Sequence, residues 1–367
     1  MRVLVLSDTP AFGQSVVRCL GQGGVTSHVW CSARLSPMRL SRYVRRYRHV
    51  PRARLTDTSP AGVARINAAC ARHDLAAVLA TDMPTTLALA QIQDQLSAPL
   101  GAYPLPELET LRRLDDKWRF AQLLDEHGVP QPPTRLIERV EDVATLGLDY
   151  PLIAKPVIGD GGTGVHRVNS AAELEAGIRR GSDRLPLLVQ GFVPGHDVDL
   201  SLLADQGEVA AYTIQQALPD TARRLFLEDE EIAEAGRQIA RATDFHGVMH
   251  LDMRRDERDG SLAVIECNPR FWGSIEMSLW VGVNFPCLGL EILQGRTVPL
   301  TRAVHLGECH ATGIAVRRLA SALVKGHLAP ADLTPASREA WFQNLADPLP
   351  ELAARAHRTY RRRRGLT

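Results

Sequence analysis

The sequence predicts an α/β fold that begins with a parallel part and continues with a mixed α+β part. Over roughly the first hundred residues, short β-branched runs alternate with helical patterns, which favours a parallel sheet covered by helices. Farther along, turns rich in glycine and proline join strand patterns directly, which favours antiparallel pairing. A chain of 367 residues is long for one domain and suits two or three sub-domains that share a cleft.

The alternation is plainest at the start of the chain. Strands are expected at residues 2–7, 28–31 and 76–80, and helices at about residues 12–21 and 84–96. A loop rich in proline and glycine follows at residues 99–106. The first domain boundary is therefore expected near residue 100.

The middle of the chain mixes helices with short strands. A helical pattern at residues 108–127 ends at Gly128, and three prolines then keep the chain extended. The other expected strands lie at residues 152–157, 163–168, 187–193, 199–204, 209–214, 248–255 and 262–267, and the other helices at residues 171–180 and 228–243. After residue 295 we expect helices and loops, with no motif of recognisable chemistry.

Composition argues against several classes of protein. Hydrophobic residues make up 45% of the chain and charged residues 23%, and no apolar run is long enough to span a membrane. The six cysteines form no CxxC pair, and the N-terminus shows no signal-peptide pattern. We therefore expect a cytoplasmic protein with reduced cysteines and no membrane partner.

One basic stretch lies at residues 34–54, where eight arginines are interleaved with Tyr43 and Tyr47. Basic and aromatic residues together could contact RNA. Because the formal net charge of the chain is only +1, we interpret the stretch as an arginine-rich, solvated helix and loop, and we predict no nucleic-acid partner. The arginine run at residues 361–364 is interpreted in the same way, as a solvated helix end.

Two of the later strand patterns flank a turn dipeptide that begins at Asp259. A hairpin centred on Asp259 would place Asp252 opposite Glu266 and His250 opposite Asn268. Because side chains two residues apart share a face of a strand, these four would converge on one patch. The alternative interpretation is a solvated hairpin end with a chance pair of carboxylates.

The predicted patch has the donor atoms of a metal site. Two bare carboxylates on directly opposed residues repel each other, and a divalent cation between them removes that conflict. Carboxylate and amide oxygens without a thiolate suit Mg²⁺. On the opposite face of the hairpin, Met253, Ile265 and Cys267 would point into a core.

The run GDGGTG at residues 159–164 satisfies G-x-G-x-x-G, but a strand pattern rather than a helix follows it, so it is not a dinucleotide-binding fingerprint. We interpret it as a flexible loop between two antiparallel strands, whose backbone N–H groups can cover phosphates. Lys155, four residues earlier in an apolar strand, would need a partner such as a bound phosphate. Without this lysine, a plain glycine hairpin would be the better interpretation.

Lysine is rare in this chain. Only three of the 43 basic residues are lysines, and two of them are Lys155 and Lys117, which follows Asp115 and Asp116 in a predicted helix. In a sequence that otherwise uses arginine, this choice suggests that the ammonium group itself is needed.

A further motif is an apolar strand that ends near Gln190 and turns through proline and glycine. The backbone groups of Gly191, Phe192 and Val193 could recognise a purine edge, and Asp197 could bind a ribose hydroxyl. Strands that end in such a turn are common, so this motif is weak evidence alone.

In their order and spacing, these motifs resemble the ATP-grasp superfamily. They are Lys117, LIAKP with the glycine loop, VQGFVPGHD, LD on the first hairpin strand and IECNPRFWGS on the second. The resemblance covers about residues 100–294. It is greatest to the carbamoyl-phosphate-synthase-like and ATP-dependent carboligase (carboxylate–amine ligase) branch, with D-Ala–D-Ala and D-aspartate ligases more distant.

The resemblance implies a division of the chain and a set of cofactors. A Rossmann-like pre-ATP-grasp domain would occupy residues 1–100, and the first ATP-grasp part, with its small lid, residues 101–193. The second ATP-grasp part, with the metal site, would occupy residues 194–300, and a C-terminal extension with a basic tail residues 301–367. The implied cofactors are ATP and Mg²⁺ at two sites, with Mn²⁺ as a substitute.

The resemblance also implies roles for individual residues. The implied nucleotide-binding residues are Lys117, Lys155, Gly161, Gly162, Thr163, Gln190, Gly191, Phe192, Val193 and Asp197. Asp252 and Glu266 would bind one Mg²⁺, and Glu266 with Asn268 the second. Arg270 and Lys155 would be catalytic, with Arg270 stabilising charge on the transferred phosphoryl group, unless it forms only a structural ion pair.

Two positions depart from the family pattern. Gln190 stands where many members carry glutamate, which puts the hydrogen bonds to adenine in doubt. His250 stands where D-Ala–D-Ala ligases carry arginine, which argues against that activity.

The implied activity is that of an ATP-dependent carboxylate–amine ligase that forms an amide through an acyl phosphate, with small-molecule acid and amine substrates. The alternatives are a carbamoyl-phosphate-synthase-like carboxylase that activates bicarbonate and a non-catalytic ATP sensor. The candidate substrate contacts are Arg223, Arg224, His250, Trp272, Ser274 and Glu276. A homodimer is the default expectation for the assembly.

Overall fold

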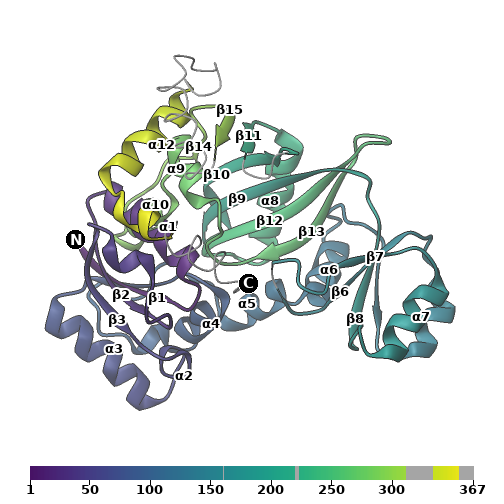
Figure 1. Cartoon of the computed structure of the whole chain (residues 1–367), viewed down its shortest axis with the longest axis horizontal. Helices are drawn as coiled ribbons and strands as arrows, with labels where there is room; N and C mark the ends of the chain where they lie inside the picture. Colours follow the sequence, from purple (N-terminus) through teal and green to yellow (C-terminus); the bar gives the residue numbers. More distant parts are fainter. Residues whose placement is uncertain (160, 220–222, 311–333, 355–367) are drawn as a thin grey trace.

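The computed structural model describes residues 1–159, 161–219, 223–310 and 334–354. Three sheets follow one another along the long axis of the molecule, with the largest in the middle (Figure 1). The predicted arginine run at residues 361–364 and much of the predicted C-terminal extension lie outside the described residues. Within the described ranges, no helix combines the length and the apolar character needed to cross a bilayer.

The first sheet is parallel, with the strand order β3-β2-β1-β4. Its strands are β1 (Arg2–Ser7), β2 (Thr26–Cys31), β3 (Val44–His49) and β4 (Ala77–Ala80). The two longest helices beside it are α1 (Pro10–Gln22) and α3 (Pro60–His73), and α2 (Arg52–Leu55) and α4 (Met83–Ile92) complete this part. Apolar side chains of β1 point into two different cores, one shared with α1 and one with α3, so the strand is buried on both faces.

Strand β3 corrects the prediction of a helix and loop at residues 34–54. Residues Val44–His49 pair in parallel with β2 and form the edge of the sheet. An edge strand has one neighbour and can expose polar side chains on both faces, which is why its arginine-rich sequence concealed it.

The second sheet is antiparallel, with the order β5-β8-β6-β7. Its strands are β5 (Thr134–Ile137), β6 (Leu152–Pro156), β7 (His166–Val168) and β8 (Leu187–Gly191), and α7 (Ala171–Arg180) packs its apolar side chains into the same core. The glycine loop joins the antiparallel strands β6 and β7, as the sequence predicts.

The third sheet has the order β13-β12-β9-β10-β11-β15, and β14 pairs with β10. Its strands are β9 (Gly195–Asp205), β10 (Glu208–Ala217), β11 (Arg223–Leu227), β12 (Gly247–Asp256), β13 (Leu262–Asn268), β14 (Thr301–Arg302) and β15 (Gly307–His310). The associated helices are α8 (Glu230–Ala242), α9 (Ile275–Trp280), α10 (Phe285–Leu293) and α12 (Pro335–Ala346). Strands β14 and β15 correct the expectation of only helices and loops after residue 295.

The helix predicted at residues 108–127 is two helices, α5 (Leu108–Asp115) and α6 (Lys117–Glu126). The break lies at Asp116, whose carboxylate accepts hydrogen bonds of 3.0 Å from the backbone of Trp118 and Arg119. This N-cap starts a new helix and sets Lys117 at its first position.

The hairpin of β12 and β13 has the predicted pairs in register, His250 with Asn268 and Asp252 with Glu266. Closer to the turn the register shifts by one residue, because Ile265 is an extra, bulged residue. The prediction that Ile265 points into a core is therefore wrong: Ile265 is half-buried and lines a cleft, whereas Met253, which also borders that cleft, and Cys267 are buried.

Candidate active site

A cleft of about 480 Å³ lies between the second sheet and the hairpin of the third; we call it the Lys155 cleft. Its lining includes Lys117, Lys155, Gly159, Gly162, Thr163, Gln190, Gly191, Phe192, Val193, Asp197, Asp199, Arg224, Asp252, Arg254 and Glu266. Most of the residues that the family resemblance implies for the nucleotide thus lie around one space.

Lys155 and Lys117 meet at this cleft from β6 and α6. Lys155 is 2% exposed, and its Nζ lies 3.3 Å from the Ile265 carbonyl oxygen and 4.0 Å from Glu266 Oε2. Burial lowers the pKa of Lys155 to about 8, although the Glu266 carboxylate opposes that change. Lys117 Nζ lies 3.4 Å from the same Glu266 oxygen and donates a 2.6 Å hydrogen bond to the Gly159 carbonyl. Two ammonium groups therefore converge beside one carboxylate.

The glycine loop takes a backbone course that needs glycine. Gly161 and Gly162 have φ angles of 62° and 72°, in the left-handed region that side chains with a β-carbon disfavour. Neither position has a heavy atom within 4 Å of where a β-carbon would be, so the requirement is conformational rather than steric. The loop can thus present backbone N–H groups to the cleft without side chains in the way.

The strand-end motif is partly engaged within the protein. The N–H groups of Gly191 and Phe192 donate to the carbonyl oxygens of Pro133 and Pro151, at 2.9 and 3.1 Å. These two N–H groups are therefore engaged within the protein, and the prediction that the backbone at residues 191–193 recognises a base would depend on the other backbone groups of this segment. The buried Gln190 amide donates a 3.0 Å hydrogen bond to Thr134.

Arg254 holds the segment that leaves this motif. Its Nε donates to the Val193 carbonyl at 2.8 Å and its Nη2 to the Gly195 carbonyl at 2.7 Å. It also forms an ion pair with Asp197. The carboxylate expected to bind a ribose thus faces the cleft with a protein cation beside it.

The predicted metal ligands are linked in a chain. Arg270 donates to Asn268 Oδ1 at 2.8 Å, and Asn268 Nδ2 donates to Asp252 Oδ2 at 3.0 Å. Burial and the nearby Asp252 carboxylate raise the pKa of Glu266, against the opposing effect of Lys117. The Arg270 guanidinium, itself 7% exposed, lies 4.8 Å from the ring centre of Phe12 on α1.

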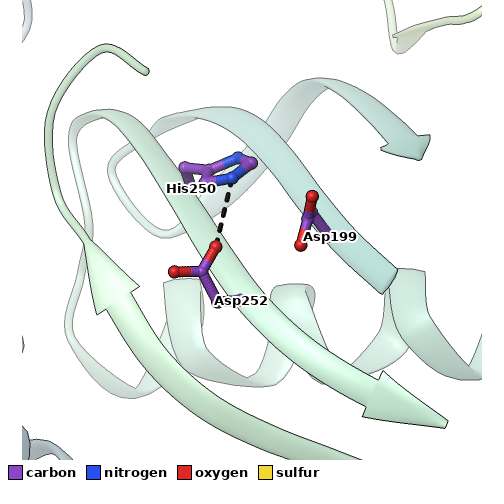
Figure 2. A group of neighbouring side chains, drawn as sticks. All are labelled: Asp199, His250 and Asp252. Atoms are coloured by element: carbon purple, nitrogen blue, oxygen red, sulfur yellow. Dashed lines mark ion pairs between the residues drawn. The ribbon is translucent and has the colours of Figure 1, made fainter. Parts of the chain in front are cut away.

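Asp199 joins this patch and was missed by the sequence analysis. It lies on β9 directly opposite Asp252 on β12, and one donor atom each of Asp199, His250 and Asp252 lies within 4.8 Å of the other two (Figure 2). His250 Nε2 is 3.2 Å from Asp252, and its Nδ1 is 2.8 Å from the Ser201 hydroxyl. The alternation of Asp197, Asp199 and Ser201 with apolar residues was a signal that could have identified it.

Burial and neighbouring charges shift the pKa values of the titratable groups in this cluster. Burial raises the pKa of Asp199 to about 6, and the repulsion of Asp252 adds to it. Burial lowers the pKa of the His250 imidazole, but the hydrogen bond to Asp252 and the negative charges of Asp252 and Asp199 together outweigh burial, so the pKa is raised. The carboxylates of Asp199, Asp252 and Glu266 provide the oxygen donors that Mg²⁺ prefers, so the residues present fit that ion.

A second cavity of about 400 Å³ adjoins the cleft; we call it the His250 cavity. The two spaces share Asp199, Arg224 and Asp252 in their linings. The rest of its lining includes Gln215, His250, Ser274, Glu276 and Trp280. Molecules bound in the two spaces would meet at the shared aspartates and arginine.

Of the six candidate substrate contacts, four line the His250 cavity and two do not. Arg224, His250, Ser274 and Glu276 line the His250 cavity. Trp272 is buried and stacks on the His250 ring, with ring centres 5.5 Å apart, so it supports the wall rather than forming it. Arg223 is absent from both linings and pairs with Glu308 on β15 at 3.0 Å.

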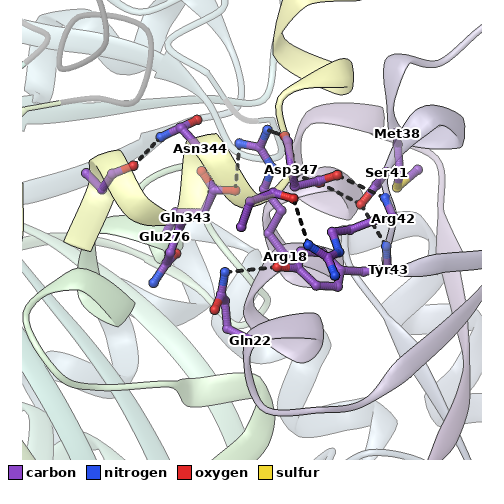
Figure 3. Close-up of polar contacts among 12 residues, drawn as sticks. Arg18, Gln22, Met38, Ser41, Arg42, Tyr43, Glu276, Gln343, Asn344 and Asp347 are labelled. Atoms are coloured by element: carbon purple, nitrogen blue, oxygen red, sulfur yellow. Dashed lines mark hydrogen bonds and ion pairs between the residues drawn. The ribbon is translucent and has the colours of Figure 1, made fainter. Parts of the chain in front are cut away.

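Glu276 forms an ion pair with a residue of α1, a helix that packs on the first sheet. Arg18 of α1 lies 3.4 Å from Glu276 and 3.5 Å from Asp347, at the end of α12 (Figure 3). Asp347 also accepts hydrogen bonds from the Ser41 hydroxyl and the Arg42 backbone, at 2.7 and 2.9 Å. Residues far apart in sequence thus fix one wall of the cavity.

Comparison with known proteins agrees with this architecture. A family model described as "ATP-grasp in the biosynthetic pathway with Ter operon" matches residues 183–316. The arginine-specific carbamoyl phosphate synthase large chains of Geobacillus stearothermophilus and Bacillus subtilis (strain 168) are 25% and 29% identical, each over 52% of this chain. The chain spans about a fifth (20%) of the length of these two relatives.

Solved structures show the same fold. The L-amino acid ligase from Bacillus licheniformis superposes with a TM-score of 0.63 and 20% identity, over 80% of this chain and 74% of that one. N5-carboxyaminoimidazole synthetase from Staphylococcus aureus gives 0.68 and 12%, over 88% and 86%. The chain has the ATP-grasp fold, and the predicted resemblance to the ATP-grasp superfamily is confirmed.

Proposed function

We propose that this chain is an ATP-dependent carboxylate–amine ligase that forms an amide through an acyl phosphate. The observation that carries the proposal is the meeting of two cavities at Asp199, Arg224 and Asp252. ATP in the Lys155 cleft would point its terminal phosphate at this junction, and an acid in the His250 cavity would present its carboxylate there. The proposal includes the predicted division of the chain at residues 100, 193 and 300.

The side chains of the cleft would act on the phosphates. Lys117 and Lys155 would neutralise phosphate oxygens, and the glycine loop would cover them and exclude water from the acyl phosphate. Asp252, Glu266 and Asn268, with Asp199, would hold Mg²⁺, which supplies further charge neutralisation when bound. Arg270 would orient Asn268 and add positive charge to the site.

The acid and amine would be handled in the His250 cavity. The substrate carboxylate would attack the terminal phosphorus, with ADP leaving, and the amine would then displace phosphate from the acyl carbon. Arg224 is the cation at the junction and would orient the carboxylate. Ser274 and Glu276 on the wall offer a hydroxyl and a carboxylate to polar groups of the acid or the amine.

Bicarbonate is the second candidate acid. It is supported by the similarity to carbamoyl phosphate synthases and, among the solved structures, to biotin carboxylases. The His250 cavity, at about 400 Å³, has room for an acid much larger than bicarbonate, which favours the first proposal.

Phosphate release from ATP and Mg²⁺ tests both proposals. Amino acids and other small acids and amines are supplied singly and in pairs, with bicarbonate as a separate arm. Wild type is compared with Glu266→Gln and with Glu257→Gln, an exposed control at the tip of the same hairpin. Turnover that needs a pair and is lost only in Glu266→Gln supports the ligase. Turnover with bicarbonate alone supports the second candidate, and nucleotide binding without turnover in any arm favours a sensor.

A further inference from the structure

A groove of about 420 Å³ lies on the first sheet, away from the cavities described above. Its floor is one face of β2 and β3, where His28 is in register with Arg46, and Trp30 with Arg48. Helix α3 packs its apolar side chains over β1 and β4 and forms only the wall of the groove. In Figure 1, α3 and β3 lie at one end of the long axis, and the strands of the Lys155 cleft, β6 and β8, toward the other.

The lining of the groove is strongly basic. It includes Arg46 and Arg48 from β3 and Arg65 and Arg72 from α3, with His28 and His73, and no carboxylate belongs to it. Arg65 pairs with Asp57 at 3.0 Å. Across the residues that the structure describes, no carboxylate oxygen within 4.0 Å pairs with Arg46, Arg48 or Arg72.

The imbalance is built into the sequence. Between Asp8 and Asp57 the chain has no aspartate or glutamate, although its net charge is only +1. The Arg48 guanidinium lies 5.3 Å from the ring centre of Trp30, which holds this cation over the floor. Burial, with the positive charges of His73 and Arg46, lowers the pKa of His28 to about 4, so the surroundings of the groove repel further positive charge.

We propose that this groove, the Arg46 groove, binds a small molecule that carries two or more phosphate groups. Guanidinium groups present paired N–H donors that match phosphate oxygens, and here they approach from both the strand and the helix. A single phosphate would engage one side and leave the other side's cations uncompensated. The volume of about 420 Å³ is that of a small-molecule site.

The test is a calorimetric titration of the full chain with phosphate, pyrophosphate and tripolyphosphate in the absence of Mg²⁺. The groove variant is Arg46→Gln with Arg72→Gln. The matched control is Arg34→Gln with Arg45→Gln, which removes the same charge from exposed positions outside the lining. The groove and control variants are also made in a Lys117→Met chain, in which we expect phosphate binding in the Lys155 cleft to be at least about tenfold weaker, so that the groove is measured separately from the proposed enzymatic site.

We expect affinity to rise from phosphate to tripolyphosphate, and to be at least about tenfold weaker in the groove variant, with the control close to wild type. Lys117→Met should leave this binding unchanged. In the wild type, tripolyphosphate should also raise the imidazole pKa of His28, as measured by NMR titration. This measurement is made on the wild-type chain and so does not require the groove variant to fold.

Equal affinity in the groove variant and the wild type would overturn the proposal, as would an unchanged His28 signal. A single-stranded RNA that binds where tripolyphosphate does not would also overturn it, because the occupant would then be a polymer. The proposal does not rest on the ligase activity, and either can fail alone.

Discussion

The guanidinium group of Arg18 lies 3.4 Å from the carboxylate of Glu276, and both side chains are largely buried. Arg18 belongs to the helix after the first strand, whereas Glu276 lines the His250 cavity. The position of a cavity wall is therefore set by a helix of the first sheet and, through Asp347, by the helix nearest the C-terminal end of the described chain.

Replacing Arg18 with methionine removes the cation that two buried carboxylates face. We expect a loss of about 3–5 kcal/mol in the free energy of unfolding, because such carboxylates keep their desolvation cost without the compensating charge. Urea denaturation measures it. Arg113→Met removes an exposed ion pair with Glu126 and should cost at most about 1 kcal/mol, so equal losses would argue against a special role for Arg18.

Replacing Lys117 with methionine removes the ammonium group between Gly159 and Glu266. We expect nucleotide affinity to fall at least about tenfold, because a charge-assisted contact to a phosphate is lost. Calorimetric titration with ADP and Mg²⁺ measures it. Arg119→Met, on the same helix but exposed and paired with Glu109, should leave the affinity unchanged; a loss in that variant too would point to the helix rather than the ammonium.

Replacing Arg254 with glutamine frees the segment at residues 193–197, which its guanidinium holds by two carbonyl oxygens and Asp197. We expect KM for ATP to rise several-fold with little change in kcat, since the loss concerns binding rather than chemistry. Steady-state kinetics separate the two. The control is Arg258→Gln, which removes the ion pair of Arg258 with Asp256 near the hairpin tip. A fall in kcat that occurs in Arg254→Gln and not in this control would contradict the expectation.

His28 should make the protein less stable in acid. Its pKa is lowered by burial and neighbouring cations to about 4 in the folded chain, against about 6.5 when unfolded. Between these values the unfolded chain binds the extra proton and the folded chain does not, so stability falls as pH drops from about 6.5 toward 4.

The change in Tm between pH 7.5 and pH 5 measures this effect. We expect it to be smaller in His28→Gln than in the wild type. His127→Gln, at an exposed position, serves as the control and should behave as wild type. An identical acid response in all three proteins would show that His28 contributes nothing.

The sequence predicted what local patterns encode. Period-two alternation and a turn centred on Asp259 predicted the pairs of Asp252 with Glu266 and His250 with Asn268, which the structure has because the unpredicted bulge at Ile265 offsets the register nearer the turn. The scarcity of lysine singled out Lys117 and Lys155, which the fold brings to one carboxylate. These features depend on neighbours in sequence or on a rare residue type.

What the sequence concealed depends on distant partners. Asp199 reaches Asp252 only because β9 and β12 pair, and no local signal states that pairing. The edge strand β3 has one neighbour and an exposed arginine pattern, so it resembled a solvated loop. Arg223 and Arg224 are adjacent in sequence, yet strand alternation gives them different surroundings: Arg224 lines both cavities and Arg223 pairs with Glu308.

The bulge at Ile265 separates the tip of the hairpin from its functional half. Pairs near the turn follow one register, and the pairs that carry Asp252, Glu266 and Asn268 follow another. The exposed tip at residues 257–260 therefore offers protein engineers an insertion point for an epitope tag or a fluorescent reporter. A label attached there would leave the cleft residues in place, whereas deletion of the single bulged residue Ile265 would merge the two registers into one continuous ladder.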